Sequence, residues 1–391
     1  MADKFKILMV HNFYQIGGGE HTVFKNEVAL LRNHGHEVFE YTRSNDELKH
    51  SKIKLLLSPF STLWSFKTYR EVRKIIKHEN INIVHCHNTF PLISPSVYYA
   101  SRSLKVPVIQ TIHNFRLLCP SGIFYHDGHI CELCKEKRKL SCAIHNKCYR
   151  NSKLQTMIVV NMLRMHRFLG TYRKINYIFL TEFNKSKFED IIDISGSNVF
   201  IKPNFVEDHF DSNSESRELF FVFAGRLDEY KGIKTLLDTW CLLDVKYDLH
   251  IYGDGEFRSY VEEMSQKNDC IKFFGFCSQE ELHSDLKKAT AMLFPSRLFE
   301  GFPMTISESF SFGCPVISSN LGNQAELIHS SHGGVTCDFE SSEELLKSIN
   351  EVIDNRGSYS ENARAYYEKY LTAENNYRLL SEIYKNAKHI R

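Results

Sequence analysis

Apolar runs of strand length alternate with helical patterns from one end of this 391-residue chain to the other. Such alternation is typical of βαβ units, in which helices connect parallel strands. A polar stretch without periodicity separates the runs of the first half from those of the second, so we expect two parallel sheets. The expected strands are residues 6–10, 81–86, 107–112, 177–181, 219–225, 248–253, 270–275, 291–295 and 314–319.

The length of the chain exceeds the usual size of one compact core, which also favours two domains. The polar linker, residues 202–218, places the boundary between an N-terminal domain over residues 1–205 and a C-terminal domain over residues 206–372. A final helical segment over residues 373–391 is expected to pack back on the N-terminal domain. The fold class is therefore α/β, with two Rossmann-like domains.

The charge of the chain is unevenly distributed. Residues 1–205 carry 30 Lys and Arg against 16 Asp and Glu, whereas the remainder carries 19 against 31. A basic half suits an anionic partner such as a membrane surface or a lipid-linked phosphate, and complementarity between the two halves is the alternative. We expect no nucleic-acid partner.

The start of the chain has neither the basic region nor the cleavage site of a signal peptide. No run of about 18 apolar residues is long enough to span a bilayer. We therefore expect a cytoplasmic protein that contacts the inner face of the membrane peripherally.

Histidines follow the first three expected strands, at His11, at His85 with His87, and at His113. The carboxyl ends of parallel strands line the ligand crevice of an open sheet, so these side chains are expected to share one crevice. A metal-dependent hydrolase built on the four histidines is one alternative, although the usual carboxylate ligands are not apparent. A non-catalytic protein that binds a sugar nucleotide is another.

A glycine-rich turn, Gly17 to Gly19, follows the first strand and precedes a helical pattern. Without side chains the backbone can approach a ligand closely, and the helix start offers free N–H groups to phosphate or sugar oxygens. The spacing is not GxGxxG, so an ordinary turn is the alternative.

In the second half, Arg226 stands just past a strand and Lys231 just before a helix. A guanidinium, an ammonium and a helix N-terminus together would hold a diphosphate without a metal ion. Two exposed surface cations are the alternative.

Further along, seven residues separate Glu300 from Glu308, with Pro303 at the start of a short helix between them. Each carboxylate can accept hydrogen bonds from paired sugar hydroxyls, and free N–H groups at the helix start suit an anion or a sugar. The residues that offer this backbone are Gly301, Phe302, Met304 and Thr305.

Together these segments resemble the large fourth family of retaining glycosyltransferases, and the resemblance covers essentially the whole chain. A bacterial polysaccharide-type subgroup with a cysteine-rich insert is the most similar. The matching segments include GGGE (17–20), TIHNFRLLCP (111–120), AGRLDEYKG (224–232), YGDGE (252–256), FGF (274–276) and FPSRLFEGFPMTISES (294–309).

The resemblance implies the GT-B fold, in which two Rossmann-like domains face each other across a cleft and a C-terminal helix crosses back. It implies transfer of a hexose from a UDP- or GDP-linked donor, with retention and without a catalytic metal. The acceptor would be a glycan or a polyprenyl-diphosphate-linked sugar of surface polysaccharide biosynthesis. A nucleotide-sugar epimerase shares the twin-Rossmann architecture but does not account for the paired cations and paired glutamates.

The resemblance also implies residue roles. Arg226 and Lys231 would bind the diphosphate and stabilise the leaving group, Glu308 would hold the ribose, and Glu300 would contact the donor sugar. His113 would face that sugar from the N-terminal domain. The remaining donor-binding positions are Gly17, Gly18, Gly19, Gly253, Phe276, Gly301, Phe302, Met304 and Thr305, with backbone near Phe276 at the base.

A cysteine-rich stretch, residues 119–148, looks like an insert in the N-terminal domain. Cys131, Cys134, Cys142 and Cys148 supply the four thiolates of a closed structural zinc site, although only the first pair has CxxC spacing. Reduced structural cysteines are the alternative, because a cytosolic chain rarely carries disulfides.

Overall fold

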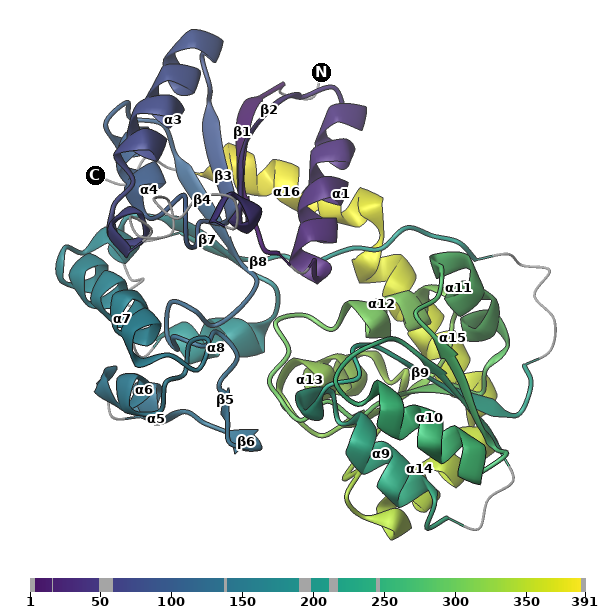
Figure 1. The fold of residues 1–391 in the computed structure, drawn as a ribbon. Coiled ribbons are helices and arrows are strands. Elements are labelled where there is room, and N and C mark those ends of the chain that lie inside the picture. The colour runs from purple at the N-terminus through teal and green to yellow at the C-terminus, as the bar shows by residue number, and fades with distance from the viewer. Residues whose placement is uncertain are drawn as a thin grey trace. The chain divides into compact units, whose positions relative to one another are not determined.

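A computed structural model describes residues 4–15, 17–48, 59–136, 139–189, 198–210, 217–243 and 247–387. The chain forms two compact α/β units (Figure 1). Unit 1 consists of Met1–Phe124, Cys131–Asn204 and Asn376–Arg391, and unit 2 consists of Tyr125–Ile130 and Phe205–Asn375. Parts of the expected linker (211–216) and of the expected final segment (388–391) lie outside the described residues.

Unit 1 is built on a six-stranded parallel sheet with the order β2-β1-β3-β4-β7-β8. Its central strands are buried on both faces because helices lie on either side of the sheet (Figure 1). The strands are β1 (Lys6–Phe13), β2 (Glu37–Ser44), β3 (Ile83–Asn88), β4 (Val108–Ile112), β7 (Asn176–Phe179) and β8 (Val199–Ile201).

One face of this sheet is covered by α1 and by the C-terminal helix α16, which both bury apolar side chains against it. Leu380 and Ile383 of α16 pack in the same core as Ile83 of β3 and Phe24 of α1. The helices of unit 1 are α1 (Gly19–Asn33), α3 (Phe66–Glu79), α4 (Ser96–Arg102), α5 (Leu133–Glu136), α6 (Ser141–His145), α7 (Lys153–Phe168) and α8 (Glu182–Glu189), joined by most of α16 (Ala373–Asn386).

Unit 2 has its own six-stranded parallel sheet, with the order β11-β10-β9-β12-β13-β14. A hairpin of β5 (Tyr125–His126) and β6 (His129–Ile130) groups with this unit, where Arg297 donates a hydrogen bond to the Gly128 carbonyl over 3.3 Å. The sheet strands are β9 (Phe220–Ala224), β10 (Asp248–Tyr252), β11 (Ile271–Gly275), β12 (Ala291–Phe294), β13 (Val316–Ser319) and β14 (Gly334–Cys337).

Helices also sandwich the sheet of unit 2. Side chains along β9 alternate between two cores, because Val222 packs on one face while Phe221 and Phe223 pack on the other. The helices are α9 (Ile233–Trp240), α10 (Arg258–Lys267), α11 (Gln279–Lys288), α12 (Met304–Ser311), α13 (Gly322–Ser331), α14 (Ser342–Asp354) and α15 (Arg356–Tyr366).

All nine expected strands are confirmed, and the strand order indicates where a ligand would bind. The order reverses between β1 and β3 in unit 1 and between β9 and β12 in unit 2. Open α/β sheets bind ligands outside the carboxyl ends of the strands at such reversals. No helix among the described residues is long and apolar enough to cross a membrane.

Candidate functional site

The carboxyl ends of β9 and β12 bring together a lysine and a glutamate that lie far apart in the sequence. Lys231 Nζ is 2.7 Å from Glu300 Oε1. Lys231 ends a short 3-10 turn, Glu229–Lys231, and Gly232 then reverses the chain into α9 with φ +74°. A Cβ at Gly232 would lie 2.0 Å from the Pro295 carbonyl oxygen, so only glycine permits this approach.

Glu300 is held in place by residues that the sequence analysis did not single out. The buried Ser296 hydroxyl donates to Glu300 Oε1 over 2.7 Å. Asn323, at the start of α13, donates to the backbone carbonyls of Glu300 and Gly301. Gln324 donates to the Leu298 carbonyl over 3.0 Å. The loop that carries Glu300 is therefore anchored to α13.

Arg226 follows β9 and is more than half exposed, with its guanidinium 2.6 Å from Asp228 Oδ2. Its charge also lies 5.8 Å from the centre of the Tyr230 ring. Asp228 itself is buried. A buried carboxylate thus orients an exposed guanidinium at the same sheet edge as Lys231.

Glu308 lies on α12, and burial raises the pKa of its carboxyl to about 7. Among the described residues none hydrogen-bonds this carboxylate, so its oxygens are available to a ligand. Met304 and Thr305 stand in the first turn of α12, where N–H groups have no partner inside the helix.

Two further positions predicted to bind the donor, Gly253 and Phe276, differ in their surroundings. Gly253 follows β10 with φ +139°, and a Cβ there would lie 1.8 Å from the Gly225 carbonyl oxygen, so close packing of neighbouring strand ends requires glycine. Phe276 follows β11 and is 84% exposed. An exposed aromatic ring at a ligand-binding edge can stack on another ring.

A cavity of about 430 Å³ opens in unit 2 beside Ser296 and Ser319. None of the predicted cations or paired glutamates lines it. Arg226, Lys231, Glu300 and Glu308 therefore do not belong to this cavity.

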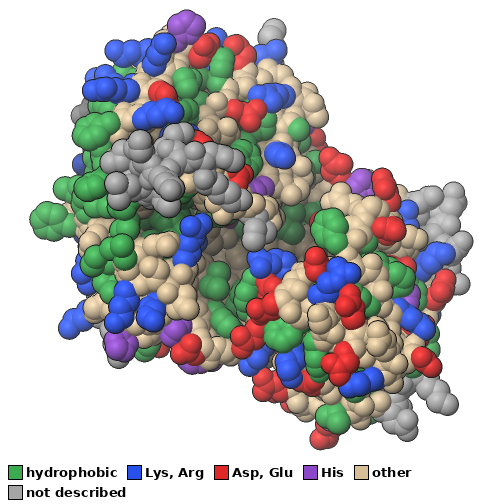
Figure 2. Space-filling model, viewed as in Figure 1, with side chains coloured by type: hydrophobic (Ala, Val, Ile, Leu, Met, Phe, Trp, Pro, Cys, Tyr) green, Lys and Arg blue, Asp and Glu red, His purple; other side chains and the backbone are tan. Residues whose placement is uncertain are grey.

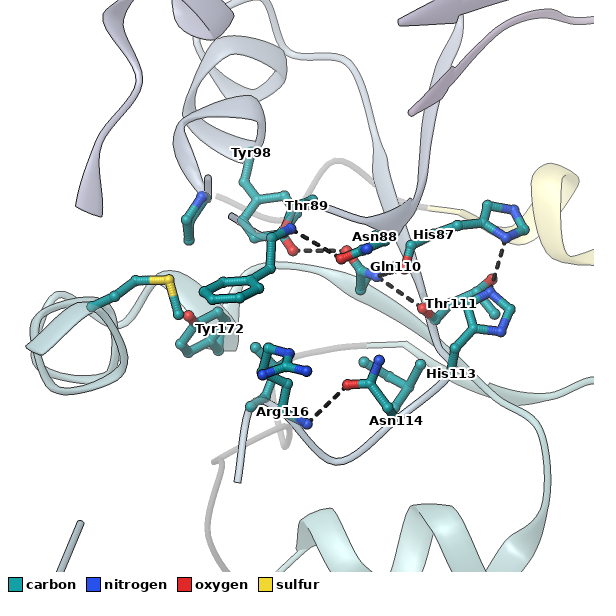
Figure 3. A pocket seen from close by; sticks show the side chains of 15 residues that line it. His87, Asn88, Thr89, Tyr98, Gln110, Thr111, His113, Asn114, Arg116 and Tyr172 are labelled. Atoms are coloured by element: carbon teal, nitrogen blue, oxygen red, sulfur yellow. Dashed lines mark hydrogen bonds between the residues drawn. The ribbon is translucent and has the colours of Figure 1, made fainter. Parts of the chain in front are cut away.

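In unit 1, His113 lies at the end of β4 beside a cavity of about 50 Å³, large enough for a few water molecules (Figure 3). Its Nε2 is 2.9 Å from Nδ1 of His87, and the two rings stack. Burial and the neighbouring His87 hold the pKa of His113 well below its usual value. Its imidazole is therefore neutral.

Behind these histidines lies a buried ion pair between Glu27 of α1 and Lys202. Burial alone would raise the pKa of Glu27, but Lys202 and His87 bring it well below the usual range. His87 Nε2 is 3.2 Å from Glu27 Oε2. The other histidine of β3, His85, is occupied by the Tyr384 and Thr111 hydroxyls, at 2.8 and 2.7 Å.

The glycine-rich turn is exposed and leads into α1 with Gly18 as the N-cap residue. Gly18 has extended backbone, with φ −143°, and a Cβ there would meet nothing within 4 Å. The conformation of the turn does not require glycine at this position. A side chain would instead occupy the open space next to the helix start.

Two carboxylates accompany the strand-end histidines, which corrects the expectation that such ligands are missing. Glu20 lies with His11 and His21, and Glu27 lies with His85 and His87. In each group the potential ligand atoms all lie within 4.8 Å of one another. Both glutamates come from α1, which no strand-end pattern reveals.

In the cysteine-rich insert, all four cysteines expected to bind zinc carry free thiols. The Sγ atoms of Cys134 and Cys142 are 3.3 Å apart. Burial, and to a lesser extent the neighbouring thiols, raise the pKa of Cys148 to about 12. Neither close ligand group among the described residues includes a cysteine, so the zinc site stays a prediction.

Residues 204–371 match the family model described as glycosyl transferases group 1, and residues 16–133 match the model described as glycosyltransferase family 4. An uncharacterized glycosyltransferase of Methanocaldococcus jannaschii is 22% identical over 377 residues, which cover 93% of this chain and 94% of that protein. Lipopolysaccharide 1,6-galactosyltransferase of Escherichia coli K12 is 31% identical over 141 residues, 34% of this chain and 39% of that protein.

Among solved structures, HepE of Anabaena in complex with UDP has a TM-score of 0.65 at 16% identity, covering 97% of this chain and 100% of that one. HepE has also been solved in complex with UDP-glucose. The likeness confirms the expected GT-B fold of two parallel-sheet α/β domains. The matched family models describe neither an epimerase nor a metal-dependent hydrolase.

Proposed function

The chain belongs to the glycosyltransferases, and from that premise we propose that it moves a hexose from a UDP- or GDP-linked donor to a glycan or lipid-linked acceptor, with retention. The observation that carries the proposal is the contact between Lys231 and Glu300. It joins the paired cations and the paired glutamates at the strand-order reversal of unit 2, where an α/β sheet binds its ligand.

Lys231 and Arg226 are proposed to neutralise the donor diphosphate. In the ligand-free protein each of these cations pairs with a single carboxylate. A diphosphate can therefore compete with that carboxylate for the positive charge. As the bond between the sugar and the phosphate oxygen breaks, negative charge grows on the diphosphate. Cations already in place stabilise that charge, so the proposed step needs no metal ion.

Glu308 and Phe276 are proposed to bind the nucleoside. A carboxylate without hydrogen-bond donors gains most from the two adjacent hydroxyls of a ribose, which restore the solvation that burial removes. The exposed ring of Phe276 offers a stacking surface for the base, next to backbone that can read its edge. Backbone at Gly253 and at Gly301 to Thr305 completes the proposed donor site.

Retention is proposed to proceed on one face of the sugar. The acceptor hydroxyl forms the new bond to the anomeric carbon, the bond to the phosphate oxygen breaks, and that oxygen takes the hydroxyl proton. This route needs no nucleophilic side chain. Glu300 is proposed to stabilise positive charge near the reacting carbon, and the neutral His113 to hydrogen-bond a sugar hydroxyl.

The acceptor side is assigned to unit 1, with the glycine-rich turn as its backbone element. On the face shown in Figure 2, both units carry basic and acidic side chains, but residues 1–205 hold 30 Lys and Arg against 16 Asp and Glu in the sequence. This distribution supports a phosphate-bearing acceptor, such as a polyprenyl-diphosphate-linked sugar of surface polysaccharide synthesis, and peripheral contact with an anionic membrane. The lipopolysaccharide galactosyltransferase among the relatives supports the same class of acceptor.

Lys231→Ala, compared with Lys234→Ala, tests the proposal. Lys234 lies three residues further on, in the first turn of α9, is half exposed and forms an ion pair with Asp238, so it is a matched control. With a panel of UDP- and GDP-sugars, including UDP-glucose, the Lys231 variant should lose about a hundredfold in kcat for donor hydrolysis and transfer. The control should keep its rate. Equal rates in both variants would refute the role of Lys231, and an inverted anomeric carbon in the product, seen by NMR, would refute retention.

We also propose one structural zinc ion in the cysteine-rich insert. The helices α5 and α6 span four and five residues, too short to be stable without a further constraint. Zinc would lower the raised thiol pKa values of this cluster by binding the thiolates. Metal analysis should find one zinc per chain, lost in Cys131→Ser/Cys134→Ser and kept in Cys241→Ser, whose thiol is exposed and distant in sequence. Absence of zinc from the unaltered chain would leave the cysteines as structural thiols.

A further inference from the structure

Three potential metal ligands meet beneath the glycine-rich turn of unit 1. They are His11 at the end of β1 and Glu20 and His21 in the first turn of α1. One ligand atom of each lies within 4.8 Å of the ligand atoms of the other two. Ligands that share one first-row divalent ion lie within roughly 4 Å of one another, so small side-chain movements would complete the set.

His11 is fully buried, yet neither of its ring nitrogens has a hydrogen-bond partner among the described residues. Its ring stacks on Phe24 and meets the edge of His21. Aromatic packing satisfies the faces of an imidazole but not its nitrogens. Buried polar atoms without partners are rare in folded proteins, and an ion or a water molecule is the usual explanation.

The other two side chains also have atoms left over. Asn114 donates to Glu20 Oε2 over 3.3 Å, but Glu20 Oε1 is buried without a partner. The Tyr14 backbone N–H donates to His21 Nε2 over 3.0 Å, so in the ion-free protein Nε2 is the acceptor and Nδ1 carries the ring proton. An ion bound by His21 would replace either the Tyr14 N–H at Nε2 or the proton at Nδ1.

The second histidine–glutamate group differs in its charge. Glu27 is neutralised by Lys202, and both nitrogens of His85 are occupied by hydroxyl groups. Glu27 Oε2 and His87 Nε2 lie 3.2 Å apart but are also buried without a hydrogen-bond partner. The Lys202 ammonium already supplies the positive charge that an ion would bring, so this group favours an ion less than the first.

We propose that His11, Glu20 and His21 bind one divalent first-row transition-metal ion, such as zinc, in unit 1. Two imidazoles and one carboxylate are a common ligand set for such ions and leave coordination positions open. The exposed glycines of the turn give access to them. The proposal is independent of the reaction proposed above, because the donor site of unit 2 relies on Arg226 and Lys231.

The electrostatics of the group favour a cation. Burial, with the neighbouring histidines, lowers the pKa of His11 to about 2, so the ring is neutral and keeps a free lone pair. Burial also raises the pKa of Glu20 to about 7, with Arg116 opposing the shift.

Co²⁺ titration of chelator-stripped, tag-free protein tests the proposal. The Cys131→Ser/Cys134→Ser chain serves as the parent, so that the insert does not compete for the ion. One equivalent should bind with visible d–d absorption and without thiolate-to-cobalt absorption. His21→Ala and Glu20→Gln, which avoid the fully buried His11, should each weaken binding by roughly tenfold or more. The control His78→Ala removes an exposed histidine of the same unit and should bind as the parent does.

Two outcomes would overturn the proposal. One is no saturable binding of Co²⁺ or Zn²⁺ by a parent chain whose circular dichroism shows that it is folded. The other is binding that His21→Ala and Glu20→Gln leave unchanged. Loss of binding in these variants with donor hydrolysis intact would support the metal site and leave the proposed function standing. Loss of donor hydrolysis in Lys231→Ala with metal binding intact would likewise show that the metal site and the donor site are separate.

Discussion

Lys202 and Glu27 form an ion pair in which neither side chain has any exposure to solvent. Asn376 of α16 accepts a further hydrogen bond from the Lys202 ammonium over 3.2 Å. The pair therefore connects α1, the end of the unit 1 sheet and the C-terminal helix. On the other side of the Glu27 carboxylate lies His87, which contacts His113.

Lys202→Met should destabilise unit 1 by about 3–5 kcal/mol, because it leaves the Glu27 carboxylate buried without its partner. Lys185→Met removes a lysine from a surface pair with Glu182 and should leave the unfolding midpoint close to that of the parent, because exposed ion pairs contribute little. Urea unfolding followed by Trp64 fluorescence measures this, in a Trp240→Phe background that leaves unit 1 with the single tryptophan of the chain. Equal midpoints for the two lysine variants would contradict the prediction.

The pH dependence of stability should have two opposed contributions. Glu27 has a folded-state pKa below its unfolded value of 4.5. Its contribution to the free energy of unfolding is therefore complete above pH 4.5 and is lost as the pH falls through the folded-state pKa. Glu308 has a folded-state pKa raised from 4.5 to about 7. Its contribution to the free energy of unfolding is therefore complete below pH 4.5 and is lost as the pH rises through about 7.

Glu308→Gln should therefore stabilise the ligand-free protein at pH 8, by roughly 1–3 kcal/mol, and have little effect at pH 4. The same change should weaken nucleotide binding if Glu308 holds the ribose. Thermal unfolding at the two pH values, with and without UDP, separates the effects. A variant that is less stable than the parent at pH 8 would show that the free carboxylate has a partner the structure does not reveal.

Substitution by alanine should have different effects at Gly232 and at Gly18, because their surroundings differ. Gly232→Ala would place a Cβ 2.0 Å from the Pro295 carbonyl oxygen at a positive φ, so the turn that carries Lys231 must move. Gly18→Ala meets nothing within 4 Å and should leave stability within about 0.5 kcal/mol of the parent.

Donor hydrolysis should fall in Gly232→Ala, whereas Gly18→Ala should keep hydrolysis and raise KM for the acceptor. This second result depends on the assignment of the glycine-rich turn to the acceptor. Unchanged acceptor kinetics in Gly18→Ala would mean that the turn only starts α1. Steady-state rates with and without acceptor are the measurements needed.

Interior strands could be recognised from the sequence, whereas edge strands other than β11 could not. Interior strands such as β1 and β9 are buried on both faces and appear as continuous apolar runs. In the two six-stranded sheets, the strands not anticipated are β2, β8 and β14, which all lie at sheet edges. β2 is mostly exposed or half buried, and β8 spans three residues, so neither has a hydrophobic run long enough to stand out.

Site residues can be predicted from the sequence where a local motif contains them. Arg226, Lys231 and Glu300 follow strands, and their spacing predicts a donor site that stays a proposal. Ser296 and Asn323 orient Glu300 through single hydrogen bonds, and their residue types are common at any loop. Such tertiary contacts leave no local pattern. The best available signal was the position of Asn323 at the start of a helix, four residues after the end of a buried strand.

Ser296→Ala should slow transfer by about tenfold in kcat with little change in donor KM. The Ser296 hydroxyl shares Glu300 Oε1 with Lys231, so its loss frees the carboxylate to turn toward the lysine and away from the sugar. A hydrogen bond to a charged group contributes about 1.5–3 kcal/mol, which corresponds to at least tenfold in rate if it acts in the transition state. Ser318→Ala removes another buried hydroxyl, from the adjacent strand β13, and should leave kcat unchanged. Equal rates in the two serine variants would show that Lys231 and the Asn323 anchor suffice to position Glu300.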